Sequence, residues 1–129
     1  MSEKKHKRRF LSTFFSERKQ VGAVAPSSRF LVNTMCNKIN FKEADVILEL
    51  GPGTGVFTTE ILKRAKPNSK IILFELNETF FQLLVDKYND PRIEVLYSSA
   101  DEILDVLKER NIEKVAAILS SLRLTVIQE

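Results

Sequence analysis

Cysteine, histidine and long apolar runs are scarce in this sequence of 129 residues, and each scarcity excludes a class of protein. The single cysteine, Cys36, excludes an internal disulfide and a cysteine-rich zinc site, and we expect it to be a small buried hydrophobic side chain. No apolar run approaches the roughly 18 residues of a membrane-spanning helix. The charged N-terminus lacks the apolar stretch of a secretory signal. We therefore expect a cytoplasmic protein with no metal site.

Histidine occurs once, at His6 in the basic N-terminal segment, where we expect it to be solvated. The sequence therefore contains no Ser-His-Asp or Cys-His arrangement for nucleophilic catalysis. At 43% hydrophobic and 29% charged residues, the composition is that of a globular protein and excludes wholesale disorder or a collagen-like repeat. The length suits one domain.

The positive charge is concentrated at the N-terminus. Seven of the 20 basic residues lie within residues 1–20, against two of the 17 acidic residues, so the rest of the chain has a small acidic excess. We expect residues 1–20 to form a basic amphipathic helix, because large apolar side chains recur at helical spacing at Phe10, Leu11, Phe14 and Phe15. Such a helix fits an anionic membrane surface. The alternatives are that the helix packs onto the domain or that it contacts RNA. If the helix anchors the protein, we expect a cytoplasmic protein that is peripheral at the inner membrane face.

Residues 21–129 form the expected domain, in which apolar strands alternate with amphipathic helices. A helix begins near Ser27, with Phe30, Leu31 and Met35 on its inner face. In the helix that Asn77 caps, four side chains are expected to cover the sheet: Phe80, Phe81, Leu84 and Tyr88. The expected strands are 46–50, 70–76, 93–97 and 115–119, and the helices between them are 55–65, 77–88 and 101–110. This alternation predicts an α/β fold with a Rossmann-like parallel sheet.

A glycine-rich turn joins the first strand to the helix after it. Gly51, Gly53 and Gly55 alternate within the segment Glu49-Leu50-Gly51-Pro52-Gly53-Thr54-Gly55. They allow a sharp bend and a close approach of a ligand, while the helix directs its unpaired N–H groups into the same crevice. Val56 stands where the dinucleotide fingerprint needs its third small residue, and no Gly-Lys-Ser/Thr follows, which excludes a P-loop. Glu49 would repel a pyrophosphate but suits a ligand with an ammonium group.

Two further acidic residues follow the next strands. Glu75 lies at the carboxyl end of the second strand and can accept hydrogen bonds from ribose hydroxyls. Asp101 follows the third strand and can accept from an adenine amine. We expect Glu49, Glu75 and Asp101 to converge at the carboxyl edge of the sheet. The structural alternatives are that Glu75 or Asp101 caps the following helix and that Glu49 pairs with a surface lysine.

These residues resemble the class I S-adenosylmethionine-dependent methyltransferases, over roughly residues 20–122. The decapeptide from Glu49 to Thr58 is most similar to the phospholipid N-methyltransferases and the rRNA adenine dimethyltransferases, and residues 22–31 are similar to the phospholipid branch. The resemblance implies S-adenosylmethionine as cofactor, with residues 29–31 closing over it. The cofactor-binding residues that it implies are Glu49, Gly51, Gly53, Gly55, Glu75, Asp101 and Ser121.

The acceptor side matches the family less well. Adenine dimethyltransferases carry an Asn-x-Pro-Tyr-type motif where this chain has Ser120-Ser121-Leu122-Arg123. In the phospholipid branch Ser121 and Leu122 fit, whereas Arg123 stands at an expected proline. The resemblance therefore implies methyl transfer to an amine acceptor, with a phospholipid head group as the main hypothesis. An rRNA adenine N6-methyltransferase relative and a non-catalytic cofactor-binding remnant are the alternatives, and the sequence identifies no catalytic residue.

The sequence ends soon after the fourth expected strand, so we expect a fold truncated there, without the C-terminal strands of the family. The expected strand order is 3-2-1-4. The apolar strand 115–119 would then be an uncovered edge, and such an edge invites pairing in a homodimer.

Overall fold

The computed structural model describes residues 29–121 and 125–128. The predicted basic helix at 1–20, the expected helix start near Ser27, and Leu122 and Arg123 lie outside the described residues. Within the part that is described, no helix is long and apolar enough to cross a membrane.

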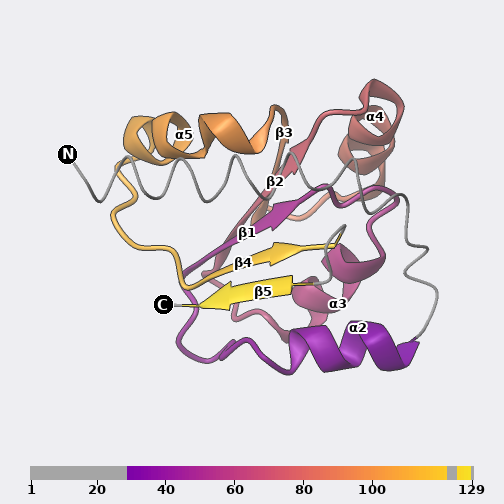
Figure 1. Ribbon diagram of the computed structural model, residues 1–129, viewed down its shortest axis with the longest axis vertical. Coiled ribbons are helices and arrows are strands. Elements are labelled where there is room, and N and C mark those ends of the chain that lie inside the picture. The colour runs from indigo at the N-terminus through magenta and orange to yellow at the C-terminus, as the bar shows by residue number, and fades with distance from the viewer. Residues whose placement is uncertain (1–28, 122–124, 129) are drawn as a thin grey trace.

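Five strands form one sheet in the order β3-β2-β1-β4-β5 (Figure 1). The pairs among the first four strands are all parallel, and only β5 runs antiparallel, against β4. The predicted α/β class and the relative order of the first four strands are confirmed. The strands are β1 (Val46–Leu50), β2 (Lys70–Glu75), β3 (Ile93–Tyr97), β4 (Ala117–Ser120) and β5 (Thr125–Gln128).

The helices lie on both faces of this sheet, with α5 on one side and α2 and α3 on the other (Figure 1). The apolar residues of β1 and β2 are buried because both faces are covered. Successive residues of β1 pack into different hydrophobic cores on the two faces of the sheet: Ile47 packs with α2 and α3, whereas Leu48 packs with α5. The helices are α2 (Arg29–Cys36), α3 (Val56–Arg64), α4 (Glu78–Lys87) and α5 (Ile103–Glu109), with a short 3₁₀ helix η1 (Ala100–Glu102) before α5.

Two expected inner faces needed correction. Phe30 is 78% exposed, whereas Met35 is buried as expected and Leu31 packs partly buried against the same core; α2 also buries Val32 and Cys36. On α4, Phe80 is exposed, whereas Leu84 is fully buried and Tyr88 packs against the same core. Cys36 is buried as expected, and desolvation raises the pKa of its thiol to about 11.

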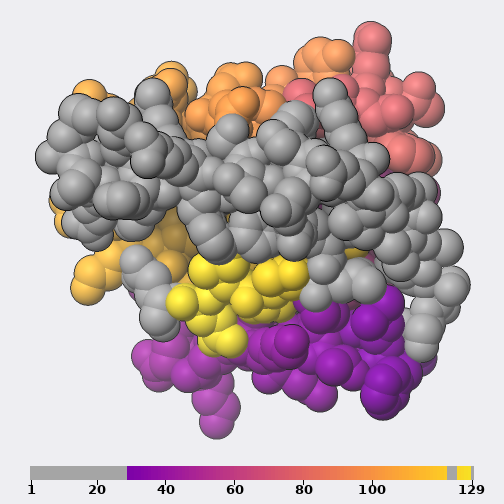
Figure 2. Space-filling view, viewed as in Figure 1, coloured from indigo at the N-terminus to yellow at the C-terminus, as the bar shows by residue number. Residues whose placement is uncertain are grey.

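The expectation of an uncovered fourth strand was wrong. β5 pairs with β4 from Ala117 opposite Gln128 to Ser120 opposite Thr125. The β-branched run of Thr125, Val126 and Ile127 suits a strand, and it supplies the main-chain partners that β4 would otherwise lack. Figure 2 shows atoms of β5, in yellow, at the surface beside the indigo atoms of α2. The homodimer hypothesis therefore loses its premise, which was an unpaired β4.

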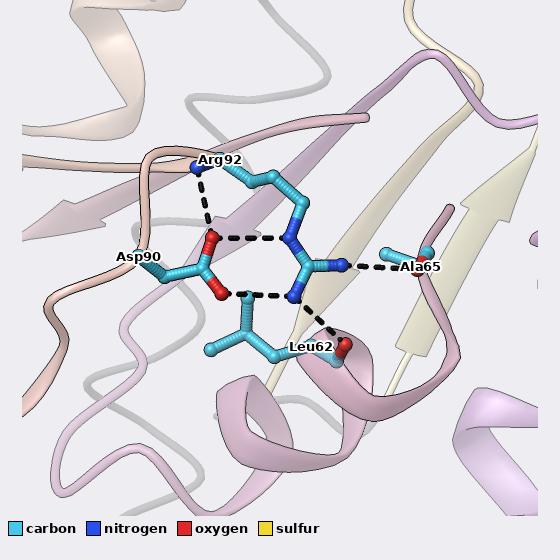
Figure 3. Close-up of polar contacts among 4 residues, drawn as sticks. All are labelled: Leu62, Ala65, Asp90 and Arg92. Atoms are coloured by element: carbon cyan, nitrogen blue, oxygen red, sulfur yellow. Dashed lines mark hydrogen bonds and ion pairs between the residues drawn. The ribbon is translucent and has the colours of Figure 1, made fainter. Parts of the chain in front are cut away.

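The carboxyl end of α3 is held by Arg92, which precedes β3. Its guanidinium donates to the carbonyl oxygens of Ala65 at 3.0 Å and Leu62 at 3.1 Å, and Asp90 binds it on the other side (Figure 3). These carbonyls belong to the last turn of the helix, where intrahelical partners are missing. Arg92 thus fixes one end of α3, and the other end forms part of the glycine turn.

Candidate functional site

The glycine turn links β1 to α3 at the carboxyl edge of the sheet. Gly51, Gly53 and Gly55 all have left-handed φ angles, of 64°, 59° and 89°. Two main-chain hydrogen bonds close the turn: Gly51 N–H donates to the Phe74 carbonyl at 2.9 Å, and Gly55 N–H donates to the Pro52 carbonyl at 2.9 Å. The turn therefore needs glycine for its backbone conformation, as the sequence predicted for this bend.

Open space lies over the middle of the turn. Apart from its two chain neighbours, no atom of the described residues lies within 4 Å of a Cβ atom built on Gly53. Gly55 is the N-cap of α3 and, as a glycine, offers no side-chain hydrogen bond to that end of the helix. The positive end of the helix and an open backbone surface thus adjoin each other, which suits a ligand that approaches the main chain closely.

Glu75 joins the second strand to this turn. It is buried; its Oε1 accepts from Gly53 N–H at 2.9 Å and its Oε2 from Asn77 N–H at 2.8 Å. Asn77 in turn caps α4 by accepting from Phe80 N–H at 3.0 Å. Glu75 therefore ties the end of β2 both to the middle of the glycine turn and to the start of α4.

Glu49 lies beneath the turn and is fully buried. Thr58 Oγ1 donates to its Oε1 at 2.5 Å, and Ser121 Oγ lies 3.1 Å from its Oε2. The pKa of Glu49 is raised to about 7, mainly because burial desolvates the carboxylate. The hydrogen bonds from Thr58 and Ser121 partly lower this pKa, and the nearby charge of Glu75 raises it. The alternative of a surface lysine partner does not apply to this carboxyl.

Ser121 connects the end of β4 to the same place. Its Oγ is also 3.0 Å from the Gly51 carbonyl oxygen and 3.3 Å from that of Leu50, so it sits where β1 enters the turn. The structure thus brings together Glu49, Ser121 and the three glycines, with Glu75 at Gly53. Asp101 lies in η1, after β3, and it is exposed; its N–H donates to Ser99 Oγ at 3.2 Å.

The sequence pattern did not indicate Thr58, Lys87 and Tyr88 as parts of this region. Thr58 lies in the first turn of α3. The sequence feature that could have identified it is a polar residue on an otherwise apolar inner face of this helix. Lys87 Nζ donates to the Thr54 carbonyl at 2.9 Å, and Tyr88 Oη donates to the Gly55 carbonyl at 2.8 Å. Neither contact has a local sequence signal, since 33 residues separate the partners.

These residues fit an adenosyl sulfonium better than a metal ion. Among the described residues no group of three His, Cys, Asp or Glu side chains could hold a metal. A glycine backbone that the described residues leave open, a helix terminus with glycine at its N-cap and a carboxylate at the end of the second strand form a surface suited to a nucleoside with an amino acid attached.

Comparison with known proteins agrees with this site. The sequence profile of the family described as ribosomal RNA adenine dimethylase matches residues 15–115. An ornithine lipid N-methyltransferase of Singulisphaera acidiphila is 32% identical over 114 residues, which are 88% of this chain and 59% of that protein. A "Probable ribosomal RNA small subunit methyltransferase A" of Pyrococcus furiosus is 33% identical over 95 residues, 73% of this chain and 34% of that protein. The chain therefore spans less than two thirds of either relative.

A solved structure supports the fold alone. The crystal structure of a "putative O-methyltransferase" from Klebsiella pneumoniae superposes with a TM-score of 0.63 at 17% identity, over 84% of this chain and 51% of that one. Methyltransferases of this class use S-adenosylmethionine as methyl donor, in agreement with the cofactor that the sequence resemblance implies. From its profile match, its sheet order and its glycine turn, the chain belongs to the ribosomal RNA adenine dimethylase family of class I S-adenosylmethionine-dependent methyltransferases.

Proposed function

We propose that this chain binds S-adenosylmethionine at the glycine turn and serves methyl transfer to an amine, with a lipid head group as acceptor. The sulfonium of the cofactor supplies an activated methyl group, so the protein contributes mainly by positioning a neutral amine in line with it. The turn would hold the methionine portion, Glu75 the ribose and Asp101 the adenine amine. Glu49 and Ser121 would support the turn from below.

The observation that carries the lipid acceptor is the similarity to the ornithine lipid N-methyltransferase, which extends over 88% of this chain. The residues at the carboxyl end of β4 add support, because Ser120 and Ser121 stand where adenine dimethyltransferases have an asparagine motif. An adenine of ribosomal RNA is the second candidate acceptor, and the family profile over residues 15–115 favours it. The excess of basic residues in 1–20 suits either polyanion.

Incubation with radiolabelled S-adenosylmethionine separates the two acceptors. One arm contains vesicles of an amine-bearing lipid, either ornithine lipid or phosphatidylethanolamine, and the other contains undermodified ribosomal RNA. Label in the lipid supports the proposal, whereas label in RNA alone replaces the lipid by the second candidate. Titration with S-adenosylhomocysteine tests the cofactor separately. Binding without label in either arm would identify a cofactor-binding chain without turnover on these acceptors.

Removing residues 1–20 tests the proposed peripheral association with the membrane. We expect the full chain to sediment with anionic vesicles at low salt, and the shortened chain to lose most of that binding, because each Lys or Arg near an anionic surface contributes about 1 kcal/mol. Neutral vesicles are the control for charge. Equal sedimentation of both chains would contradict a membrane role for this segment.

Gly53→Ala tests the turn as a cofactor site. The added Cβ meets open space among the described residues, so the expected cost to stability is the left-handed strain of about 1–2 kcal/mol. In the complex the methyl group would occupy the surface that the cofactor approaches, and we expect the Kd for S-adenosylhomocysteine to rise at least about tenfold, which is roughly 1.4 kcal/mol.

Asn111→Ala is the matched control for Gly53→Ala. Asn111 also has a left-handed φ, of 56°, but it follows α5. Alanine tolerates this backbone conformation less well than asparagine, but the added strain is smaller than at Gly53 because Asn111 already carries a Cβ atom. The Kd should therefore stay within about twofold while stability falls. Equal affinity losses in both variants would show that general destabilisation, and not the turn, determines binding.

A further inference from the structure

The carboxyl end of α4 contacts the glycine turn on its outer side. Lys87 Nζ donates to the Thr54 carbonyl oxygen at 2.9 Å, and Tyr88 Oη donates to the next carbonyl, that of Gly55, at 2.8 Å. The Lys87 ammonium also lies 5.4 Å from the centre of the Tyr88 ring. Two consecutive carbonyls of the turn are thus held by two consecutive residues of another element.

Tyr88 is closely fitted to Gly55. Its hydroxyl also lies 2.7 Å from Thr59 Oγ1, and Thr59 Oγ1 donates to the Gly55 carbonyl at 3.0 Å. A Cβ atom on Gly55 would collide with the Tyr88 hydroxyl, so there is no space between the ring and the turn. Burial raises the pKa of Tyr88, which keeps its hydroxyl protonated and able to donate at neutral pH.

The turn needs such support for a physical reason. Three residues of its five, from Gly51 to Gly55, are glycines, which retain the most conformational freedom in the absence of restraints. A ligand that binds a mobile loop must order it first, and that ordering reduces affinity. The carbonyls of Thr54 and Gly55 belong to the two peptide units that lead into α3. The N–H of the first unit, that of Gly55, closes the turn onto the Pro52 carbonyl, and the N–H of the second, that of Val56, is the first of the helix.

We propose that Tyr88 and Lys87 are positioning residues that hold the glycine turn in its ligand-binding conformation. The inference deepens the proposed function and rests on it for the identity of the ligand, S-adenosylmethionine or its product. Neither side chain is assigned a contact with the cofactor. Their effect passes through the carbonyls of Gly55 and Thr54, so their removal should loosen the turn and weaken binding together.

Tyr88→Phe and Lys87→Gln test the proposal in the full chain. Hydrogen exchange of the amides from Gly53 to Thr58 is measured without any ligand, and the Kd for S-adenosylhomocysteine is measured by titration calorimetry. We expect faster exchange confined to the turn in both variants. The Kd should rise about fivefold for Tyr88→Phe, the effect of one lost hydrogen bond, and about two- to threefold for the more exposed Lys87→Gln.

Ser69→Ala is the matched control for a lost buried hydroxyl. Ser69 Oγ donates to the Ala44 carbonyl at 2.7 Å, and it lies just before β2, at the opposite edge of the sheet from the turn. We expect a loss of stability comparable to that of Tyr88→Phe, with unchanged exchange in the turn and unchanged Kd.

The outcomes separate the inference from the proposed function. If the unmodified chain does not bind S-adenosylhomocysteine, the proposed function fails. The rates of amide hydrogen exchange in the glycine turn then still decide whether Tyr88 and Lys87 hold the turn. Unchanged exchange in both variants overturns the positioning role. That role is also overturned if Ser69→Ala weakens binding as much as Tyr88→Phe, since stability alone would then explain the effect.

Discussion

Glu49→Gln is expected to remove a pH dependence of protein stability. In the unmodified protein the free energy of unfolding should fall by about 3 kcal/mol between pH 4.5 and pH 7, and the variant should lack this fall. The folded protein has a Glu49 pKa of about 7, against 4.5 in an unfolded chain. Between these values the folded state binds more protons than the unfolded state, so stability decreases as the pH rises. Below pH 4.5 both states are protonated and the contribution vanishes, whereas above pH 7 the full cost is present.

Glutamine suits the site because it is nearly isosteric and carries no charge. Its amide oxygen can accept from Thr58 and its amide group can donate to Ser121, so both hydroxyl partners of Glu49 are retained. The variant should therefore be more stable than the unmodified protein at pH 8 and similar to it at pH 4. Urea unfolding across this pH range measures the difference.

Glu94→Gln is the control with the opposite sign. The Arg110 guanidinium binds Glu94 through both oxygens, at 2.8 Å and 2.5 Å, and lowers the pKa of that carboxyl. Its charge contributes stability that is present above the unfolded pKa and is lost as the pH falls, so glutamine should destabilise the protein at neutral pH. If the two variants shift stability in the same direction at pH 8, or if Glu49→Gln keeps the original pH profile, the buried-charge interpretation of Glu49 is wrong.

Gly55→Ala is expected to destabilise the protein by about 3 kcal/mol and to abolish measurable binding of S-adenosylhomocysteine. The φ of 89° costs an L-residue roughly 1–2 kcal/mol, and the collision of the new Cβ with the Tyr88 hydroxyl adds an overpacking cost of about 1–3 kcal/mol. The turn must shift to relieve the collision, and this moves the first residues of α3. Thermal unfolding and calorimetric titration measure the two effects.

Tyr88→Phe should recover part of the stability lost in Gly55→Ala. Removal of the hydroxyl eliminates the worst contact, although the ring carbons 3.2 Å from the added Cβ and the backbone strain remain. The double variant should thus be more stable than Gly55→Ala, even though Tyr88→Phe alone destabilises the protein. Additive losses would mean that strain, and not the collision, sets the cost at Gly55.

Much of the fold follows from local patterns in the sequence. The apolar runs at β1 and β2, the Asn77 cap of α4 and the glycine turn all depend on residues within a few positions of one another. Helical periodicity was less reliable at element ends, and for that reason Phe30 and Phe80 were expected inside but lie exposed. Residues before Arg29 lie outside the described structure, and the predicted role of the basic segment stays a prediction.

The pairing of β4 shows what a local pattern leaves open. The run of Thr125, Val126 and Ile127 has strand propensity, but propensity does not specify a partner. The order of the sheet depends on which edges remain unsatisfied once β1 has paired with β2 and β4. β5 therefore covers an edge that the sequence pattern alone had left exposed.

The sequence by itself determined the α/β class, the left-handed glycine turn and the acidic residues near it, because backbone preference and side-chain chemistry are local properties. Only the tertiary structure decided that Glu49 is buried against hydroxyls and that α4 holds the turn from outside. Ser121 reaches Glu49 across 72 positions, and Tyr88 reaches Gly55 across 33. Contacts over such separations, and the desolvation that raises the pKa of Glu49, arise only when the sheet brings distant segments together.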